Sequence, residues 1–301
     1  MGRTWIGRMV AAAAVAAACG GEPEAQPEAP GAVAVVDDAG RRVALPAPAR
    51  RIVSLVPSVT ETVVALGGAD RLVARTRYDL DPALAELPSV GGGLDPAVEA
   101  LVGLRPDLVV AWNARDDRIL RPRLAQAGIP VYSAAVEDTA AVFSTIERIG
   151  ILLGRAGAAD SLARTLRDSL AAVAAEAPAV RPAVLYLIDG DPPRTAGAAS
   201  FIGQLVGIAG GRAAFPELDA AWPAVSLEAI LARSPDVIVL PEGPGLPTAK
   251  DLSSRPGWRD LPALEGDRVV RVPADLLARP GPGIARAARA LRTGLARLEA
   301  P

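Results

Sequence analysis

A twelve-residue segment that occurs twice is the feature that most limits the fold of this chain. Residues Glu99–Val110 (EALVGLRPDLVV) align without a gap to Glu228–Val239 (EAILARSPDVIV), and five of the twelve positions are identical. Each copy predicts a helix that opens at the glutamate, a Pro-Asp turn and an apolar strand. The chain is therefore expected to contain two similar units of the same secondary structure.

The surroundings of the two copies also correspond. The apolar run Ile52–Val56 leads into a loop and a helix that ends at glycines 67–68, and Val184–Ile188 leads in the same way to glycines 210–211. Glycine suits such positions because helices often end in a residue with positive φ. Short strands alternate with helices through both halves, which is the α/β pattern. The predicted fold class is α/β, with two similar lobes.

The segment between the two units differs from both of them. From Thr139 to Ala177 the chain has no proline and is rich in Ala, Leu and Arg. This composition predicts two helices, the second from about Ala158 to Glu176. The expected division is an N-terminal lobe at 35–138, a helical connector at 139–180 and a C-terminal lobe at 181–301. Ligands of two-lobed α/β proteins bind between the lobes, outside the carboxyl ends of the strands.

The first 34 residues predict export. Residues 1–18 carry Arg3 and Arg8 and then an uncharged apolar run, which is typical of a signal peptide. That run is shorter than the roughly 20 residues that span a bilayer. Cys19, the single cysteine, follows three alanines and resembles the lipidated residue of a bacterial lipoprotein; a plain secretory signal is the alternative. Residues 19–34 predict a flexible tether, and residues 35–43 a hairpin that turns at 38–40.

The absence of histidine excludes whole classes of site. A Ser-His-Asp triad, a histidine zinc site and a histidine-ligated haem cannot form. The net charge of −2 argues against a nucleic-acid surface. We therefore expect no catalytic residue, no resident metal and no resident cofactor. An exported α/β hydrolase remains an alternative on fold alone, although no G-x-S-x-G elbow occurs. A sensor domain that binds without transport is another.

Four segments together resemble a known family. They are Arg51–Glu61 (RIVSLVPSVTE), Leu104–Trp112 (LRPDLVVAW), Trp222–Glu228 (WPAVSLE) and Ala232–Asp236 (ARSPD). They resemble the ABC-transporter substrate-binding proteins for cobalamin, haem and iron-siderophores, and above all the vitamin B12 (cobalamin)-binding members. The resemblance runs from about Val35 to the C-terminus.

The resemblance implies a fold and a role. The fold would be two α/β lobes joined by a single long backbone helix, with the ligand cleft between them. The role would be to capture cobalamin or a related corrinoid and to deliver it to an ABC permease/ATPase complex in the inner membrane. A ferric siderophore or haem is the alternative ligand. The protein is then expected to be a monomer in the periplasm or at the cell surface, anchored by its N-terminal lipid.

The resemblance also implies that one acidic residue on each lobe docks onto arginines of the permease. Glu99 and Glu228 match those two positions, one in each copy of the repeat. Two carboxylates on one face could grip a two-fold symmetric permease through charge-assisted hydrogen bonds. The alternative is that each glutamate only interacts favourably with the N-terminus of its own helix.

For the ligand, the resemblance implies a cage of aromatic side chains from both lobes. Tyr78, Trp112 and Trp222 match cage positions, whereas Arg194, Leu276 and the glycines 91–93 occupy positions that are aromatic in the family. Each aromatic pair adds about 0.5–1.5 kcal/mol beyond burial. A cage with fewer aromatic residues therefore implies weaker corrin binding, a differently placed corrin or another ligand. In the haem alternative Tyr78 would ligate the iron as a phenolate.

Polar residues complete the list of candidates. Arg194 and Arg279 are expected in loops that face the cleft, where an arginine fork suits a carboxylate; an ordinary solvated arginine is the alternative. Ser58 is a candidate for a ligand hydrogen bond, although its S-x-x-E spacing to Glu61 predicts a capping box at a helix start. Three aromatic residues have no expected ligand role: Tyr132 and Tyr186 on core strands, and Trp258 in a surface turn.

Overall fold

The computed structural model describes residues 31–113, 119–190, 192–218 and 220–299. The chain from Gly31 onward forms one compact unit. The predicted signal peptide, Cys19 and residues 19–30 of the predicted tether lie outside the described residues. The last two tether residues, Val33 and Ala34, belong instead to the first strand. Within the described part of the chain, no helix is both long enough and apolar enough to cross a membrane.

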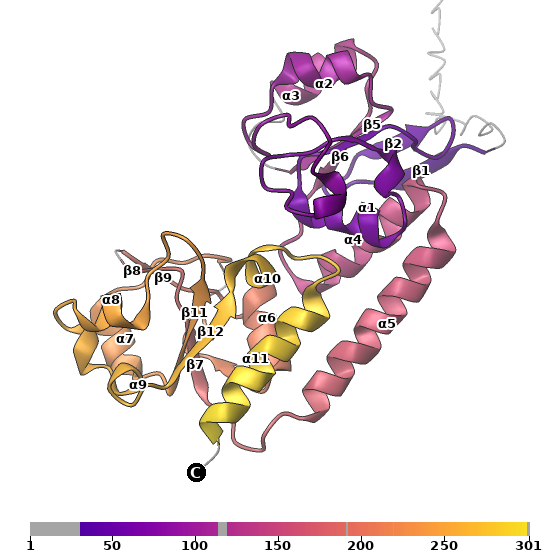
Figure 1. Cartoon of the computed structure of the whole chain (residues 1–301). Coiled ribbons are helices and arrows are strands. Elements are labelled where there is room, and N and C mark those ends of the chain that lie inside the picture. Colours follow the sequence, from indigo (N-terminus) through magenta and orange to yellow (C-terminus); the bar gives the residue numbers. More distant parts are fainter. Residues whose placement is uncertain (1–30, 114–118, 191, 219, 300–301) are drawn as a thin grey trace, which may run out of the picture. The chain divides into compact units, whose positions relative to one another are not determined.

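The N-terminal lobe is built on a parallel sheet in the order β4-β3-β5-β6 (Figure 1). Helices α1 and α4 pack on one face of this sheet, and α2 and α3 pack on the other. An antiparallel hairpin of β1 and β2 precedes the sheet. The elements are β1 (Val33–Val36), β2 (Arg42–Leu45), β3 (Ile52–Ser54), α1 (Pro57–Ala65), β4 (Leu72–Ala74), α2 (Val98–Leu104), β5 (Leu108–Trp112), α3 (Leu120–Gln126), β6 (Val131–Ala134) and α4 (Thr139–Leu152).

The C-terminal lobe repeats this plan with a parallel sheet in the order β10-β7-β11-β12. Helices α6 and α11 pack on one face, and α7, α8 and α9 pack on the other. The elements are β7 (Ala183–Tyr186), the short pair β8 (Asp189–Gly190) and β9 (Pro193–Arg194), α6 (Phe201–Ile208), β10 (Arg212–Ala213), α7 (Leu227–Arg233), β11 (Val237–Glu242), α8 (Ala249–Ser253), α9 (Pro262–Glu265), β12 (Val269–Pro273), α10 (Ala274–Ala278) and α11 (Ile284–Glu299).

The central strands are mostly apolar because both faces of each sheet are covered by helices. In β5, Leu108 and Val110 face the core shared with α1 and α4, whereas Val109 and Ala111 face α2 and α3. The stretch Val237–Leu240 of β11 alternates in the same way between two cores. Such continuous apolar runs are typical of parallel sheets covered by helices on both sides.

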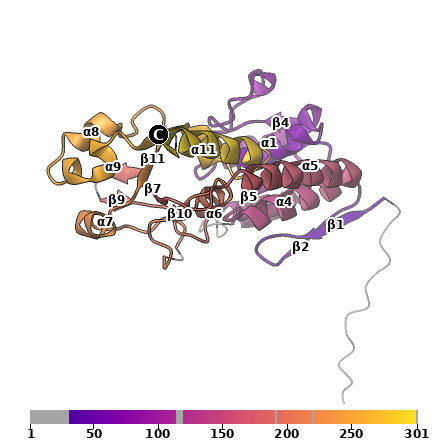
Figure 2. The same cartoon turned by 90° about the horizontal axis from the view of Figure 1, so that it is seen from below.

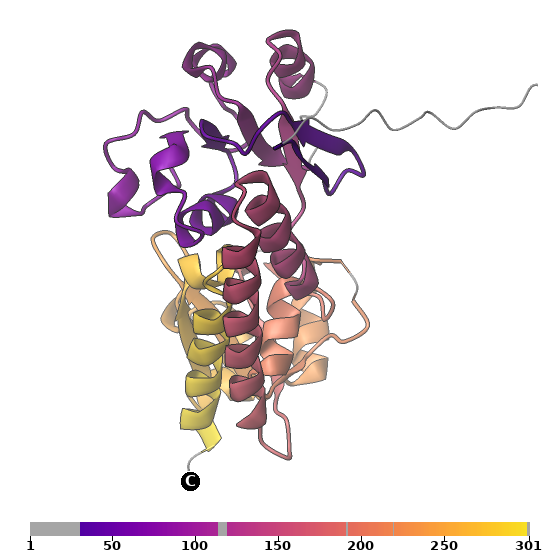
Figure 3. The same ribbon diagram turned by 90° about the vertical axis from the view of Figure 1, so that its right-hand side faces the viewer.

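A single long helix, α5 (Ala156–Ala175), runs past both lobes. Figure 3 shows it beside α4 at the N-terminal lobe and beside α11 at the C-terminal lobe, and Figure 2 shows the same arrangement from below. At about 1.5 Å per residue, its 20 residues span roughly 30 Å. Leu166 and Leu170 of α5 belong to one hydrophobic core that also holds Leu152 of α4 and Leu291 of α11. The two-lobed fold with a long backbone helix is thereby confirmed.

The repeated segment has the same structure in both lobes. Its helices, α2 and α7, each begin one residue before the glutamate and end in a left-handed residue, Arg105 (φ 46°) and Ser234 (φ 43°). The aspartate of the following Pro-Asp turn then holds the start of the first sheet strand of its lobe. Asp107 accepts hydrogen bonds from the backbone N–H groups of residues 50 and 51, at 2.8 and 3.0 Å. Asp236 accepts one from Ala183 N–H at 2.6 Å.

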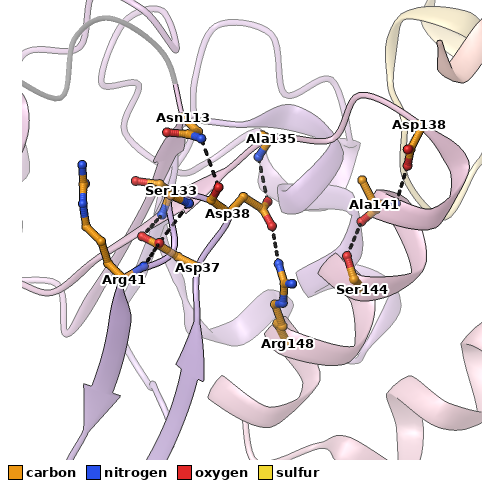
Figure 4. Close-up of polar contacts among 11 residues, drawn as sticks. Asp37, Asp38, Arg41, Asn113, Ser133, Ala135, Asp138, Ala141, Ser144 and Arg148 are labelled. Carbon is orange, nitrogen blue, oxygen red and sulfur yellow. Dashed lines mark hydrogen bonds and ion pairs between the residues drawn. The ribbon is translucent and has the colours of Figure 1, made fainter. Parts of the chain in front are cut away.

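The turn of the predicted hairpin is tied to the N-terminal lobe by two aspartates (Figure 4). Asp37 is buried and accepts from the backbone N–H of Arg41 at 2.8 Å and of Ser133 at 3.2 Å. Asp38 accepts from Ala135 N–H at 2.7 Å and forms an ion pair with Arg148 of α4. The hairpin of β1 and β2 is therefore fixed to β6 and α4.

The three aromatic residues without an expected ligand role are all buried. Tyr132 and Tyr186 lie in core strands, as predicted. Trp258 does not lie in a surface turn: its exposed fraction is 3%, and it packs in the outer core of the C-terminal lobe. Gly257, with φ of 80°, turns the chain into a 3-10 helix (Trp258–Asp260) that points the indole inward.

Candidate ligand-binding cleft

A cavity of about 900 Å³ lies between the two lobes. Its N-terminal wall comes from residues that follow β3, β4 and β5, and its C-terminal wall from the loop at Trp222 and from α10 after β12. This is the expected place, outside the carboxyl ends of parallel strands. The lining residues are Pro57, Ser58, Tyr78, Gly93, Leu94, Asp95, Trp112, Trp222, Ala274, Asp275, Ala278 and Arg279.

The three aromatic residues predicted for the cleft all line this cavity. Tyr78 and Trp222 are 52% and 42% exposed, and Trp112 is half-buried at the end of β5. Trp222 packs against the buried ring of Tyr186, with 6.2 Å between ring centroids and 45° between planes. Burial raises the pKa of the Tyr186 hydroxyl above its ordinary value, so this ring stays neutral. The cavity thus offers aromatic faces from both lobes.

Ser58 lines the cavity but does not cap a helix. Helix α1 begins at Pro57, a favoured first helical residue, and its N-cap is Val56, whose side chain makes no capping bond. The predicted capping box is therefore wrong, because the helix starts two residues earlier than the spacing suggested. The Ser58 hydroxyl is buried and has no hydrogen-bond partner among the residues that the structure describes. Gly281 of the other lobe covers it: a Cβ there would lie 2.9 Å from the Ser58 carbonyl oxygen.

Arg279 lines the cavity, but its guanidinium is already bound. One terminal nitrogen lies 2.8 Å from Glu61 Oε1 of α1, and the other donates to the carbonyl oxygen of Tyr78 at 2.8 Å. Both partners belong to the N-terminal lobe, so Arg279 joins the lobes at the base of the cavity. Sequence reasoning found Arg279 and not Glu61, because 218 residues separate the pair.

The glycines 91–93 have a packing role. A Cβ at Gly93 would lie 2.3 Å from the carbonyl oxygen of Leu55, and one at Gly92 would lie 2.0 Å from Asp95 Oδ1. Side chains are absent here because the loop passes directly over the end of β3 and makes room for the ion pair of Arg77 and Asp95, at 2.9 Å. An aromatic side chain at Gly92 or Gly93 would require a different course of this loop.

Two lining carboxylates, Asp95 and Asp275, were missed by sequence reasoning. Asp275 lies in the first turn of α10, directly after β12, and its position after a strand was the available signal. Its neighbour Leu276 points away from the cavity and packs against the core. Arg194 is not among the lining residues; its guanidinium donates to the Trp222 carbonyl oxygen at 3.3 Å.

The two glutamates of the repeat are exposed on their lobes. The Glu99 side chain is 84% exposed and forms an ion pair of 2.9 Å with Arg123 of α3. Glu228 lies in the first turn of α7. Its own backbone N–H first, and then the Ser226 hydroxyl, hold the pKa of Glu228 below its ordinary value. Both side chains are thus accessible, and their helix positions match.

Comparison with known proteins agrees with the fold. Residues 52–276 match the periplasmic binding protein family. The chain is 30% identical over 258 residues to the uncharacterized ABC transporter substrate-binding lipoprotein YvrC of Bacillus subtilis (strain 168), covering 82% of this chain and 80% of the relative.

Two solved structures show the same architecture. The periplasmic vitamin B12 binding protein BtuF of Vibrio cholerae has a TM-score of 0.67 and 27% identity, covering 84% of this chain and 99% of that one. The periplasmic heme-binding protein BhuT, in complex with two hemes, has a TM-score of 0.73 and 28% identity, covering 83% and 99%. These similarities extend through both lobes. The chain belongs to the periplasmic binding protein family, whose members bind solutes for transport.

Proposed function

We propose that this protein captures cobalamin or a related corrinoid in the interlobe cleft and delivers it to an ABC importer. The observation that carries the proposal is the cavity of about 900 Å³ with Tyr78 and Trp112 on one wall and Trp222 on the other. Flat aromatic faces suit a large planar macrocycle, because stacking adds to the burial of apolar surface. The name of the Vibrio cholerae neighbour, a vitamin B12 binding protein, supports the same ligand class.

Calorimetric titration with cyanocobalamin tests the ligand. We expect binding at micromolar concentration or tighter, and a weaker complex in Trp112→Ala and Trp222→Ala. Phe143→Ala is the matched control, since Phe143 lies on α4 under Arg167 and outside the cavity. Absence of heat and of any change in the corrin absorbance with the wild-type protein would contradict the proposal.

Haem is the second candidate ligand, and one observation favours it. Tyr78 is 52% exposed at the cavity wall, where a phenolate could reach iron, and the Arg77 guanidinium lies 5.4 Å from its ring centroid. BhuT, a structural neighbour, is a heme-binding protein. A shifted Soret band on addition of haem, lost in Tyr78→Phe, would favour this candidate over the corrinoid. A ferric siderophore would depend less on the tryptophans than on the arginines.

For delivery, we propose that Glu99 and Glu228 dock onto basic residues of the permease. Their exposure and their equivalent positions in the two lobes support this role. In a transport assay with the cognate importer, Glu99→Ala combined with Glu228→Ala should lower uptake and leave ligand affinity unchanged. Glu86→Ala combined with Glu265→Ala is the control, with one exposed glutamate in each lobe. Normal uptake in the first pair would refute the docking role.

We also propose that the exported protein is a monomer held to the membrane by lipid on Cys19, which lies outside the described residues. The three alanines before Cys19 and the lipoprotein relative YvrC support the anchor. The mass of the mature protein would carry the lipid, and Cys19→Ser would release the protein into the soluble fraction. Retention of Cys19→Ser at the membrane would argue for another anchor.

A further inference from the structure

The charged side chains on the cleft wall are few, and their balance is negative. Among the lining residues, Asp95, Asp275 and Arg279 carry the formal charges. Two of the three form ion pairs with oppositely charged side chains: Asp95 with Arg77 and Arg279 with Glu61. With these two partners counted, the described charged residues at the cavity have an excess of one negative charge.

Among the described residues of the wall, Arg279 is the only cationic one, and its charge is already paired. The Arg279 side chain is 18% exposed, and its two terminal nitrogens are bound to Glu61 and to the Tyr78 carbonyl oxygen at 2.8 Å each. A ligand carboxylate would have to share this guanidinium with Glu61, a carboxylate that is already positioned and partly buried. An arginine of this kind is a weak attractor for anions, because its charge is compensated in place.

The carboxylate of Asp275, by contrast, is available. It forms no hydrogen bond or ion pair with any residue in the described ranges, and it lies at the cavity wall in an exposed first turn of α10. An ionised carboxylate accepts hydrogen bonds and cannot donate one. It therefore favours a ligand that presents N–H donors, and it repels a ligand that presents further carboxylates.

We propose that the cleft selects corrinoids whose peripheral side chains are amides over those whose side chains are free carboxylates, a preference that rests on the proposed function. The described residues of the wall offer aromatic faces to the macrocycle, an acceptor to the amide N–H groups and no unpaired cation to an acid. The same balance disfavours anionic tetrapyrroles, whose propionates would meet Asp275 and the compensated Arg279. The ligand class is thus an uncharged or cationic, amide-bearing macrocycle.

The test compares cyanocobalamin with its monocarboxylate derivatives, in which one amide is hydrolysed to an acid. The two ligands share the same corrin and differ by one charge at neutral pH. Calorimetry at low ionic strength should show the acid binding about tenfold or more weakly when that group faces Asp275. The difference should shrink in high salt, because salt screens charge repulsion.

Two variants assign the preference to named groups. Asp275→Asn removes the unpaired charge, and Glu61→Gln removes the charge that compensates Arg279. In each variant, the affinity difference between cyanocobalamin and its monocarboxylate should shrink severalfold. Asp70→Asn is the control, since Asp70 is exposed and does not line the cavity. Melting temperatures of all three variants verify that the fold is kept.

The outcomes separate this inference from the proposed function. Equal or tighter binding of the acid by the wild-type protein would overturn the inference and leave corrinoid binding intact. The inference would also be overturned if Asp70→Asn reduced the affinity difference between the two ligands as much as Asp275→Asn does. The effect would then come from net charge alone. Failure of both ligands to bind would overturn the proposed function and the inference with it.

Discussion

The guanidinium of Arg279 and the carboxylate of Glu61 join the two lobes across 2.8 Å. The arginine follows α10 in the C-terminal lobe, and the glutamate lies on α1 in the N-terminal lobe. The pair is partly buried, with exposed fractions of 18% and 30%. It therefore closes the base of the cleft, while α5 and the shared core connect the lobes from behind.

Removing this pair should loosen the lobes without separating them. We expect Arg279→Met to lower the free energy of unfolding by about 1–3 kcal/mol, since hydrogen bonds to a charged group are lost and Glu61 is left partly buried. Spin labels at Asp70→Cys and Glu265→Cys, in a soluble chain that lacks Cys19, should show a modestly broader distance distribution. Arg286→Met, an exposed arginine of α11, is the control. An unchanged distribution would mean that α5 alone fixes the lobes.

A second prediction concerns the glycine loop. Gly93→Ala should destabilise the protein by about 1–3 kcal/mol, because its methyl group would overlap the Leu55 carbonyl oxygen. Gly103→Ala should instead stabilise it by about 0.5–1 kcal/mol, because Gly103 lies within α2 with no atom within 4 Å of an added Cβ. Denaturant unfolding of the two variants measures both effects. If both variants changed the free energy of unfolding in the same direction, the close contact assigned to Gly93 and the open space assigned to Gly103 would not both be right.

The main elements of the fold were predictable because local chemistry determines them. The helix Val98–Leu104 begins within one residue of the predicted glutamate, and the apolar strand Leu108–Trp112 follows the Pro-Asp turn as predicted. Apolar periodicity, a Pro-Asp turn and glycine at helix ends carry that information within a few residues. The two lobes were predictable from the repeated segment, since it places equivalent elements in both halves of the chain.

The remaining errors depend on contacts between distant residues. Arg279 meets Glu61 only after both lobes have folded. The capping box at Ser58 failed because Pro57 starts α1 earlier. Trp258 is buried because neighbouring helices of the C-terminal lobe cover it. The aromatic cleft residues were found through their family positions, whereas Asp95 and Asp275 had no local signal stronger than a place after a strand or beside a turn.

A third prediction compares the aspartates of the two repeats. Asp107→Ala should cost about 1–3 kcal/mol of stability, because two backbone N–H groups at the start of β3 lose a charged acceptor. Asp236→Ala should cost less, about 0.5–1.5 kcal/mol, because it releases one backbone N–H, at the start of β7. Asp168→Ala on the exposed face of α5 is the control and should change stability by less than about 0.5 kcal/mol. An inverted order would show that strand anchoring does not set these costs.

A fourth prediction concerns pH. The backbone N–H of Glu228 and the Ser226 hydroxyl hold the pKa of Glu228 below its ordinary value. A lowered folded-state pKa stabilises the protein above the unfolded-state pKa, and this stabilisation is lost as the pH falls through the folded-state pKa. Ser226→Ala should raise the pKa of Glu228 toward its ordinary value, whereas Ser226→Thr should keep it low. Carboxyl-carbon NMR titration measures both; equal pKa values in the two variants would exclude the hydroxyl as a cause.

The last prediction concerns the contact between Tyr186 and Trp222, which orients one wall of the cleft. The two rings pack with 6.2 Å between centroids, and the hydroxyl of Tyr186 stays neutral because burial raises its pKa. Tyr186→Leu should weaken corrinoid binding roughly 2- to 10-fold, since an aromatic pair contributes about 0.5–1.5 kcal/mol. Tyr186→Phe keeps the ring and should bind like the wild type in calorimetry. If Tyr186→Leu also bound like the wild type, Tyr186 would not be the contact that positions the Trp222 indole. The hydrogen bond from the Arg194 guanidinium to the Trp222 carbonyl oxygen would then be that contact.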